Sequence, residues 1–133
     1  MVMDGLSATR RPLVLAIAEG ALRGVLAAHL TLHDHMPIIC TDHLDPALGP
    51  ALRAAAILVI EETLIAAAPE QWAETLRDQC WGGALIVIVH FMPDGVRETE
   101  GIALVDRAMA VSAVPELVAK WQASGTRLLN LPD

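Results

Sequence analysis

The chain has 133 residues, the length of one domain that can bury a core without disulfides or metals. Apolar residues make up 54% of the sequence, with three Trp, one Phe and no Tyr, so we expect a globular protein with an aliphatic core. The formal net charge is −7 and the longest basic run is Arg10–Arg11, which excludes direct binding of nucleic acid as the expected role.

The first apolar run predicts a strand followed by a helix. PLVLAIA at 12–18 has the length and composition of a strand buried on both faces. From Gly20 to Leu32, apolar residues recur at helical spacing. Two Arg before this run imitate an export signal, but Glu19 and Arg23 interrupt the run. We therefore expect a cytoplasmic protein without a membrane-binding or membrane-spanning segment.

The middle of the chain predicts three further strands, each a short apolar run. They cover Met36–Thr41, Ala54–Glu62 and Ala84–His90. Helices are predicted between them at Pro46–Arg53, where the pattern is weak, and at Pro69–Gln79, which begins with a helix-starting proline.

The last third has a poorly patterned stretch at 91–107, in which only a short helix is considered. Ala108–Ser112 is predicted as a fifth strand and Pro115–Ala123 as the final helix. Five short apolar strands that alternate with helices predict a parallel sheet covered on both faces. The expected fold class is therefore a three-layer α/β sandwich.

The cysteines and tryptophans are expected mainly in the core. Cys40 and Cys80 have apolar or aromatic neighbours, which favours buried thiols in a reducing compartment over a disulfide framework. Trp72 and Trp121 fall on the inward stripes of predicted helices. Trp81 is the better candidate for an interface.

The stretch HDHMPIICTDH, residues 33–43, concentrates histidine and aspartate as a metal site would. The strand within it separates its ends by roughly 16 to 20 Å. His33 and His35 are therefore expected at one edge of the sheet, and Asp42 and His43 at the other. No single metal ion can bind both groups.

Polar residues are expected to gather at the carboxyl edge of the sheet, where open α/β sheets bind ligands. They are Glu19, Asp42, His43, Glu61, Glu62 and His90. Such a group could hold a divalent metal, or it could consist of ordinary polar residues where strands leave the core, and the second interpretation is favoured. Nucleotide-binding and hydrolase motifs are missing, so we expect no enzyme activity.

Acidic residues close the first strand in AIAEG and the third strand in ILVIEET. In this layout, residues 12–124 resemble the receiver domain of two-component response regulators. The resemblance implies a five-stranded parallel sheet with the flavodoxin-like strand order 2-1-3-4-5. Residues 1–11 would then be an N-terminal extension and residues 125–133 a C-terminal tail.

The resemblance also assigns acidic positions. Receivers bind Mg²⁺ with two acidic residues after the first strand, whereas here Glu19 stands alone. Glu61 stands where the family has the Asp that accepts the phosphoryl group, and Glu62 and Asp42 are further equivalents of the acidic pocket. A glutamate at the acceptor position makes phosphorylation the less expected outcome.

Two other positions of the family pattern differ in kind. Val89 or His90 replaces the hydroxyl residue that ends the fourth strand of a receiver. Val111 replaces the Lys that ends the fifth strand, and a valine cannot supply a cation. These replacements are typical of a degenerate receiver that no longer responds to phosphorylation.

We therefore expect a non-catalytic signalling domain, a pseudo-receiver, without a cofactor. By the resemblance, it would bind a signalling protein or a second copy of itself through the face of its fourth helix, fifth strand and fifth helix, which includes residues 107–122. Glu61 would stand in permanently for the phosphate charge. The alternative is a still-responsive receiver or a small metal or ligand sensor that binds Mg²⁺ or another ligand through Glu19 and Glu61.

Overall fold

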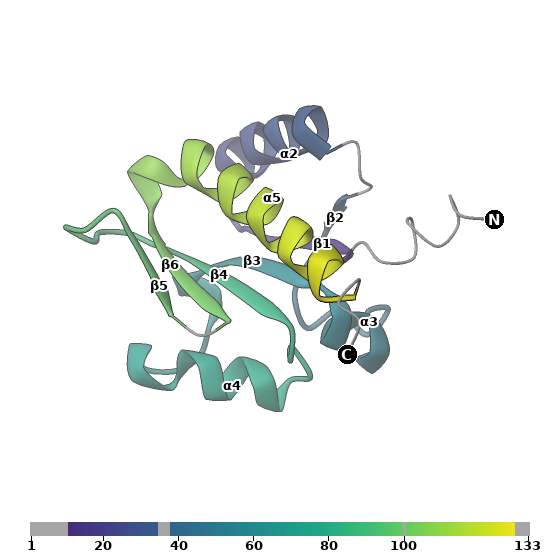
Figure 1. Ribbon diagram of the computed structural model, residues 1–133. Coiled ribbons are helices and arrows are strands. Elements are labelled where there is room, and N and C mark those ends of the chain that lie inside the picture. The colour runs from purple at the N-terminus through teal and green to yellow at the C-terminus, as the bar shows by residue number, and fades with distance from the viewer. Residues whose placement is uncertain (1–10, 35–37, 100, 130–133) are drawn as a thin grey trace.

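A mostly parallel sheet forms the centre of the protein (Figure 1). The computed structural model describes residues 11–34, 38–99 and 101–129, with the backbone alone at 33, 34 and 124–129. Within them the sheet has six strands in the order β2-β1-β3-β4-β6-β5. The parallel strands are β1 (Leu13–Ala16), β2 (Ile38–Cys40), β3 (Ile57–Glu61), β4 (Ala84–Val89) and β6 (Ile102–Asp106). The remaining strand, β5 (Val96–Thr99), pairs antiparallel with β6.

Helices cover both faces of the sheet (Figure 1). On one face, α2 (Gly20–Asp34) and α5 (Ala110–Leu129) lie side by side. On the other face lie α3 (Pro50–Ala55) and α4 (Trp72–Asp78). The predicted α/β class is therefore confirmed. The expectation of five strands in the order 2-1-3-4-5 is wrong in detail, because β5 adds a sixth strand at one edge.

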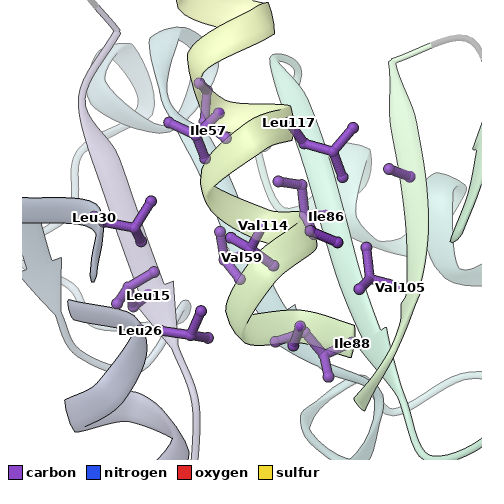
Figure 2. Close-up of a cluster of buried hydrophobic side chains, with 14 of the residues drawn as sticks. Leu15, Leu26, Leu30, Ile57, Val59, Ile86, Ile88, Val105, Val114 and Leu117 are labelled. Carbon is purple, nitrogen blue, oxygen red and sulfur yellow. The ribbon is translucent and has the colours of Figure 1, made fainter. Parts of the chain in front are cut away.

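The strands are buried because their apolar side chains point alternately to the two faces of the sheet. Figure 2 shows the cluster between the sheet and the α2 and α5 helices, which includes Leu15, Leu26, Val59, Ile86 and Val114. The cluster on the opposite face includes Leu58, Val87, Trp72, Leu76 and Trp81. Two apolar layers therefore hold the sheet between the helices.

The segment after β4 differs most from its prediction. Ala108–Ser112 is not a strand, because it belongs to the 3₁₀ turn Arg107–Met109 and the first turn of α5. The fifth parallel strand is β6, and it forms a hairpin with β5 inside the stretch where a helix was considered. β5 has no apolar run because it is largely exposed, and the apolar run of β6 is only four residues long.

The last helix also starts earlier and ends later than expected. It contains Pro115 rather than beginning there. Proline has no N–H, so the carbonyl of Val111 lacks its usual partner one turn later. Val114, Leu117 and Val118 are buried against the sheet on either side of this position. Their packing holds the helix in place despite the missing hydrogen bond.

The turn after α4 reverses two expectations. Cys80, in this turn, has a φ of 77° and is exposed rather than buried. Cys40, at the end of β2, is also exposed. Trp81, expected at an interface, is fully buried. Its Nε1–H donates to the carbonyl of His43 at 3.2 Å, and the guanidinium of Arg53 lies 5.7 Å from its ring centroid. The left-handed residue thus turns the chain so that the tryptophan enters the core.

The close approach of Gly83 to the end of α3 gives a stability test. A Cβ at Gly83 would lie 2.5 Å from the carbonyl oxygen of Ala56, whereas a Cβ at Gly82 would meet open space. We expect Gly83→Ala to lower the free energy of unfolding by about 1 to 3 kcal/mol, because backbone segments must move apart. Gly82→Ala should change it by less than about 0.5 kcal/mol. Urea denaturation measures both values, and equal stability of the two variants would contradict the close approach.

Candidate functional site

The carboxyl ends of the parallel strands meet at one edge of the sheet. The strand register places Glu61 of β3 beside Ile88 of β4, which pairs with Val105 of β6. Because side chains alternate along a strand, Glu61 points to the same face as Val59, towards α2 and α5. Since β1 lies between β2 and β3, the strand order reverses at the β1–β3 boundary, where ligand sites form in such sheets.

Glu61 is buried, with 6% of its surface exposed. Its Oε1 accepts the backbone N–H of Ala18 at 2.6 Å and that of Glu19 at 3.1 Å. Both N–H groups belong to the connection between β1 and α2. A buried carboxylate needs such donors, because removing its charge from water is otherwise unfavourable. The side chain of Glu61 therefore ties the end of β3 to the loop after β1.

Arg107 supplies a cation to the same place. Its Nη2 pairs with Oε1 of Glu19, and its Nη1 lies 3.9 Å from Oε2 of Glu61. Arg107 directly follows β6, so Arg107 rather than Val111 stands at the end of the fifth parallel strand. We call Glu19, Glu61 and Arg107 the central ion cluster.

The role of Arg107 was missed because the fifth strand was predicted a few residues too late. The available signal was the apolar stretch Ile102–Val105, which ends in an acidic residue and then a basic one. Asp106 and Arg107 would have marked the end of a strand at this point. A cation, the guanidinium of Arg107, thus lies at the end of this strand, where Val111 was expected.

Two more carboxylates at this edge accept backbone N–H groups from a neighbouring loop. Glu62 Oε2 accepts the N–H of His90, directly after β4, at 2.5 Å. Asp106 Oδ1 accepts the N–H of Met92 at 2.7 Å, and its Oδ2 accepts the N–H of Ala108 at 2.9 Å. Asp106 thus fixes the loop after β4 and caps the turn that leads into α5.

Asp42 and His43 form a separate group. Asp42 is exposed, and its Oδ1 accepts the N–H of Leu44 at 3.1 Å within a turn. His43 is 3% exposed, and its backbone carbonyl accepts the Nε1–H of Trp81. Its Nδ1 is 3.2 Å from Asp42 Oδ1 but without the geometry of a hydrogen bond. Neither residue makes a polar contact with the central ion cluster in the described part of the chain.

The remaining predicted positions lie apart. Val89 is buried at the end of β4, and the His90 side chain is exposed beyond it. Val111 is partly buried in the first turn of α5 and so does not end a strand. The side chain of His33 and the whole of His35 fall outside the described residues.

A cavity of about 260 Å³ opens beside the ends of β1 and β2. Its polar lining includes Arg23, Thr41 and Asp42, and Cys40 and Leu64 also border it. Arg23 Nη1 donates to the carbonyl of Ile17 at 2.8 Å, and Thr41 Oγ1 donates to Asp45 Oδ2 at 2.7 Å. These polar groups are thus held by the protein itself, and Glu19 and Glu61 do not line the cavity.

The part of the chain that the structure describes contains neither a metal-binding cluster nor a helix that could cross a membrane. No group of three or more His, Cys, Asp and Glu side chains there is placed to hold a metal ion. None of the helices in these residues combines the length and the apolar character needed to cross a bilayer. Comparison of the chain with protein-family models, curated proteins and solved structures finds no match.

The acceptor role of Glu61 predicts a graded loss of stability. Glu61→Gln keeps an oxygen for the N–H groups of Ala18 and Glu19 but loses the charge that faces Arg107. We expect it to lower the free energy of unfolding by about 1 kcal/mol, and Glu61→Ala by about 1 to 3 kcal/mol, because the alanine leaves the donors without an acceptor.

Chemical denaturation measures these losses. Glu74→Gln, at an exposed position on α4, is the control and should stay within about 0.5 kcal/mol of the wild type. A Glu61→Ala variant as stable as this control would contradict the acceptor role.

The burial of His43 predicts a pH dependence. Burial lowers the pKa of His43 below its usual 6.5, Asp42 opposes this shift and Arg53 adds to it. As the pH falls below about 6.5, the unfolded state binds the proton first, so His43 makes stability decrease on acidification by at most about 1.4 kcal/mol per pH unit.

Urea unfolding between about pH 7.5 and 5.5 should therefore give a smaller loss for His43→Gln than for the wild type. His90→Gln, which removes an exposed imidazole, is the matched control. The same pH profile for His43→Gln and the wild type would show that His43 is not the group responsible.

Proposed function

We propose that this chain is a non-catalytic regulatory domain of receiver-like architecture that acts through contacts with protein. The central ion cluster carries the proposal. The carboxylate at the end of β3 is buried, accepts two backbone N–H groups and faces Arg107. We infer that it acts as a fixed negative charge, at the position that the resemblance equates with the phosphoacceptor of a receiver.

The order of the parallel strands supports the receiver-like part of the proposal. β2-β1-β3-β4-β6 is the order 2-1-3-4-5 that the resemblance implies, once β6 is counted as the fifth parallel strand. The departure is β5, which occupies the chain segment between the fourth and fifth parallel strands, where the resemblance implies a helix. The output face of this protein therefore contains a strand edge in place of a helix.

The contacts of the cluster support the absence of phosphoryl chemistry. Transfer of a phosphoryl group needs an accessible acceptor oxygen, bound Mg²⁺ and cations that offset the developing charge. Here Glu61 Oε1 accepts two N–H groups, and Arg107 is paired with Glu19, the one acidic residue available at the metal position. The groups that would serve the reaction are bound to one another.

The proposed partner is a signalling protein or a second copy of the chain, bound through α5 and the adjacent edge of the sheet. The part of residues 107–122 that is exposed includes Ser112, Glu116 and Lys120. A net charge of −7 favours a protein surface with basic groups over nucleic acid or an anionic membrane. We expect this interaction to take place in the cytoplasm.

Treatment with phosphodonors tests the proposal. Acetyl phosphate with Mg²⁺ should leave the intact mass unchanged, and beryllofluoride with Mg²⁺ should leave the amide spectrum unchanged, because Glu61 and Arg107 are already engaged. A receiver that has the acceptor Asp serves as positive control in the same buffer. A mass increase on the chain, lost in Glu61→Gln, would overturn the proposal.

Calorimetric titration with Mg²⁺ separates the alternative, a responsive receiver or a metal sensor that uses Glu19 and Glu61. We expect no saturable heat for the wild type. Saturable heat that disappears in Glu61→Gln would favour the alternative, and Glu74→Gln controls for a nonspecific effect of removing one surface charge.

A further inference from the structure

Strand β5 leaves an edge of the sheet open, because in the described residues it pairs with β6 alone. The N–H of Asp106 donates to the carbonyl of Gly95 at 2.7 Å and so sets the phase of the ladder. Hydrogen-bonded residues alternate along an antiparallel strand, so Arg97 and Thr99 direct their backbone groups to β6. The alternate residues of β5 must direct their backbone groups away from β6.

Val96 and Glu98 are the outward residues of β5. The N–H of Val96 donates to the carbonyl of Asp94 at 2.9 Å, which agrees with its pointing away from β6. The N–H of Glu98 and the carbonyls of Val96 and Glu98 are thus directed to the side where an additional strand would pair.

A groove of about 290 Å³ runs between this edge strand and α5. Its apolar lining is Val96, Ala113 and Leu117, and its charged lining is Glu98, Glu116 and Lys120. This volume lies at the lower limit of pockets for drug-sized molecules, about 300 Å³, and the apolar lining can pack against an aliphatic side chain. Side chains and outward backbone groups of the same two β5 residues therefore border one binding surface.

The charges that line the groove favour a ligand that carries a positive charge next to its aliphatic side chain. Lys120 Nζ donates to Glu98 Oε2 at 2.7 Å and Trp121 Nε1–H donates to Oε1 at 3.3 Å. These hydrogen bonds lower the pKa of Glu98, with Lys120 the larger cause, so Glu98 is ionised at neutral pH. Lys120 offsets one carboxylate, and the exposed Glu116 leaves the groove negative.

A second copy of the chain fits this edge poorly. A two-fold axis at Arg97 or Glu98 would place that residue opposite its own copy, and an axis at Val96 would place Glu98 opposite Asp94 of the other copy. Like charges directly opposite each other destabilise a strand pair. A different chain with the complementary pattern avoids this repulsion.

We propose that the groove between β5 and α5 binds an extended segment of a partner protein as an added strand, with an aliphatic side chain between the strand and the helix and a Lys or Arg beside Glu98 and Glu116. This inference deepens the proposed function and rests on it for the class of partner. Hydrogen bonds from the strand edge position the segment, and the groove selects its side chains.

The test uses the peptide Lys-Val-Leu-Val-Lys, whose Lys and Leu side chains share one face when it is extended. Added to the isotopically labelled full chain, it should produce saturable shifts in the amide signals of β5 and of α5 near Ala113–Lys120. The peptide Glu-Val-Leu-Val-Glu should bind at least about tenfold more weakly, because its charges oppose those of the groove. Peptides N-methylated at alternate amides, in both phases, should lose binding in the phase that pairs with β5.

Two substitutions at Glu98 separate the contribution of its backbone N–H to binding from that of its carboxylate. Glu98→Pro removes an outward N–H that β6 does not use, and proline is tolerated at such an edge position. Glu98→Ala removes the same carboxylate and keeps the N–H. We expect binding to Glu98→Pro to be about two- to tenfold weaker than to Glu98→Ala, as one lost hydrogen bond implies. The N-methylated peptides test the same bond if Glu98→Pro does not fold.

Several results would overturn the inference: no saturable shift at β5, equal affinity for both peptide charges, or unchanged binding in both N-methylated phases. Concentration-dependent shifts of β5 signals without peptide would make a second copy the occupant instead. If the peptide fails while phosphodonors leave the protein unchanged, the proposed function stands and the contact site is wrong. If phosphodonors modify the protein while the peptide binds, the contact site is right and the proposed function is wrong.

Discussion

The burial of the Glu61 carboxylate is the constraint on which the carboxyl edge of this protein depends. A charge at the end of a buried strand is strongly unfavourable unless donors and an opposite charge surround it. Its partners come from the loop after β1 and from the turn after β6, which are far apart in the sequence. Satisfying one side chain therefore sets the positions of two connections and of the start of α5.

Glu62 and Asp106 repeat the same solution at the ends of β3 and β6. Each accepts an N–H from the loop that follows β4, so two carboxylates hold this one loop in place. The acidic character of the edge follows from this use, since an ionised carboxylate accepts several hydrogen bonds and donates none. An edge organised in this way has a structural reason for its charge.

The sequence predicted those elements whose burial is complete. β1, β3 and β4 have continuous apolar runs because both of their faces are covered, and their predicted limits differ by a few residues at most. The hairpin of β5 and β6 was not recognised because β5 is largely exposed and polar and the apolar run of β6 is only four residues long. That error hid Arg107, and no local pattern indicates that Cys80 would adopt a left-handed conformation and bring Trp81 into the core.

Helix α5 connects the central ion cluster to the groove beside β5. The turn that carries Arg107 runs directly into it, and Lys120 lies roughly 20 Å further along at 1.5 Å per residue. Between them, Pro115 leaves the Val111 carbonyl without its helical hydrogen bond. The part of α5 that links the turn of Arg107 to the groove is therefore held by its packing against the sheet as well as by its own hydrogen bonds.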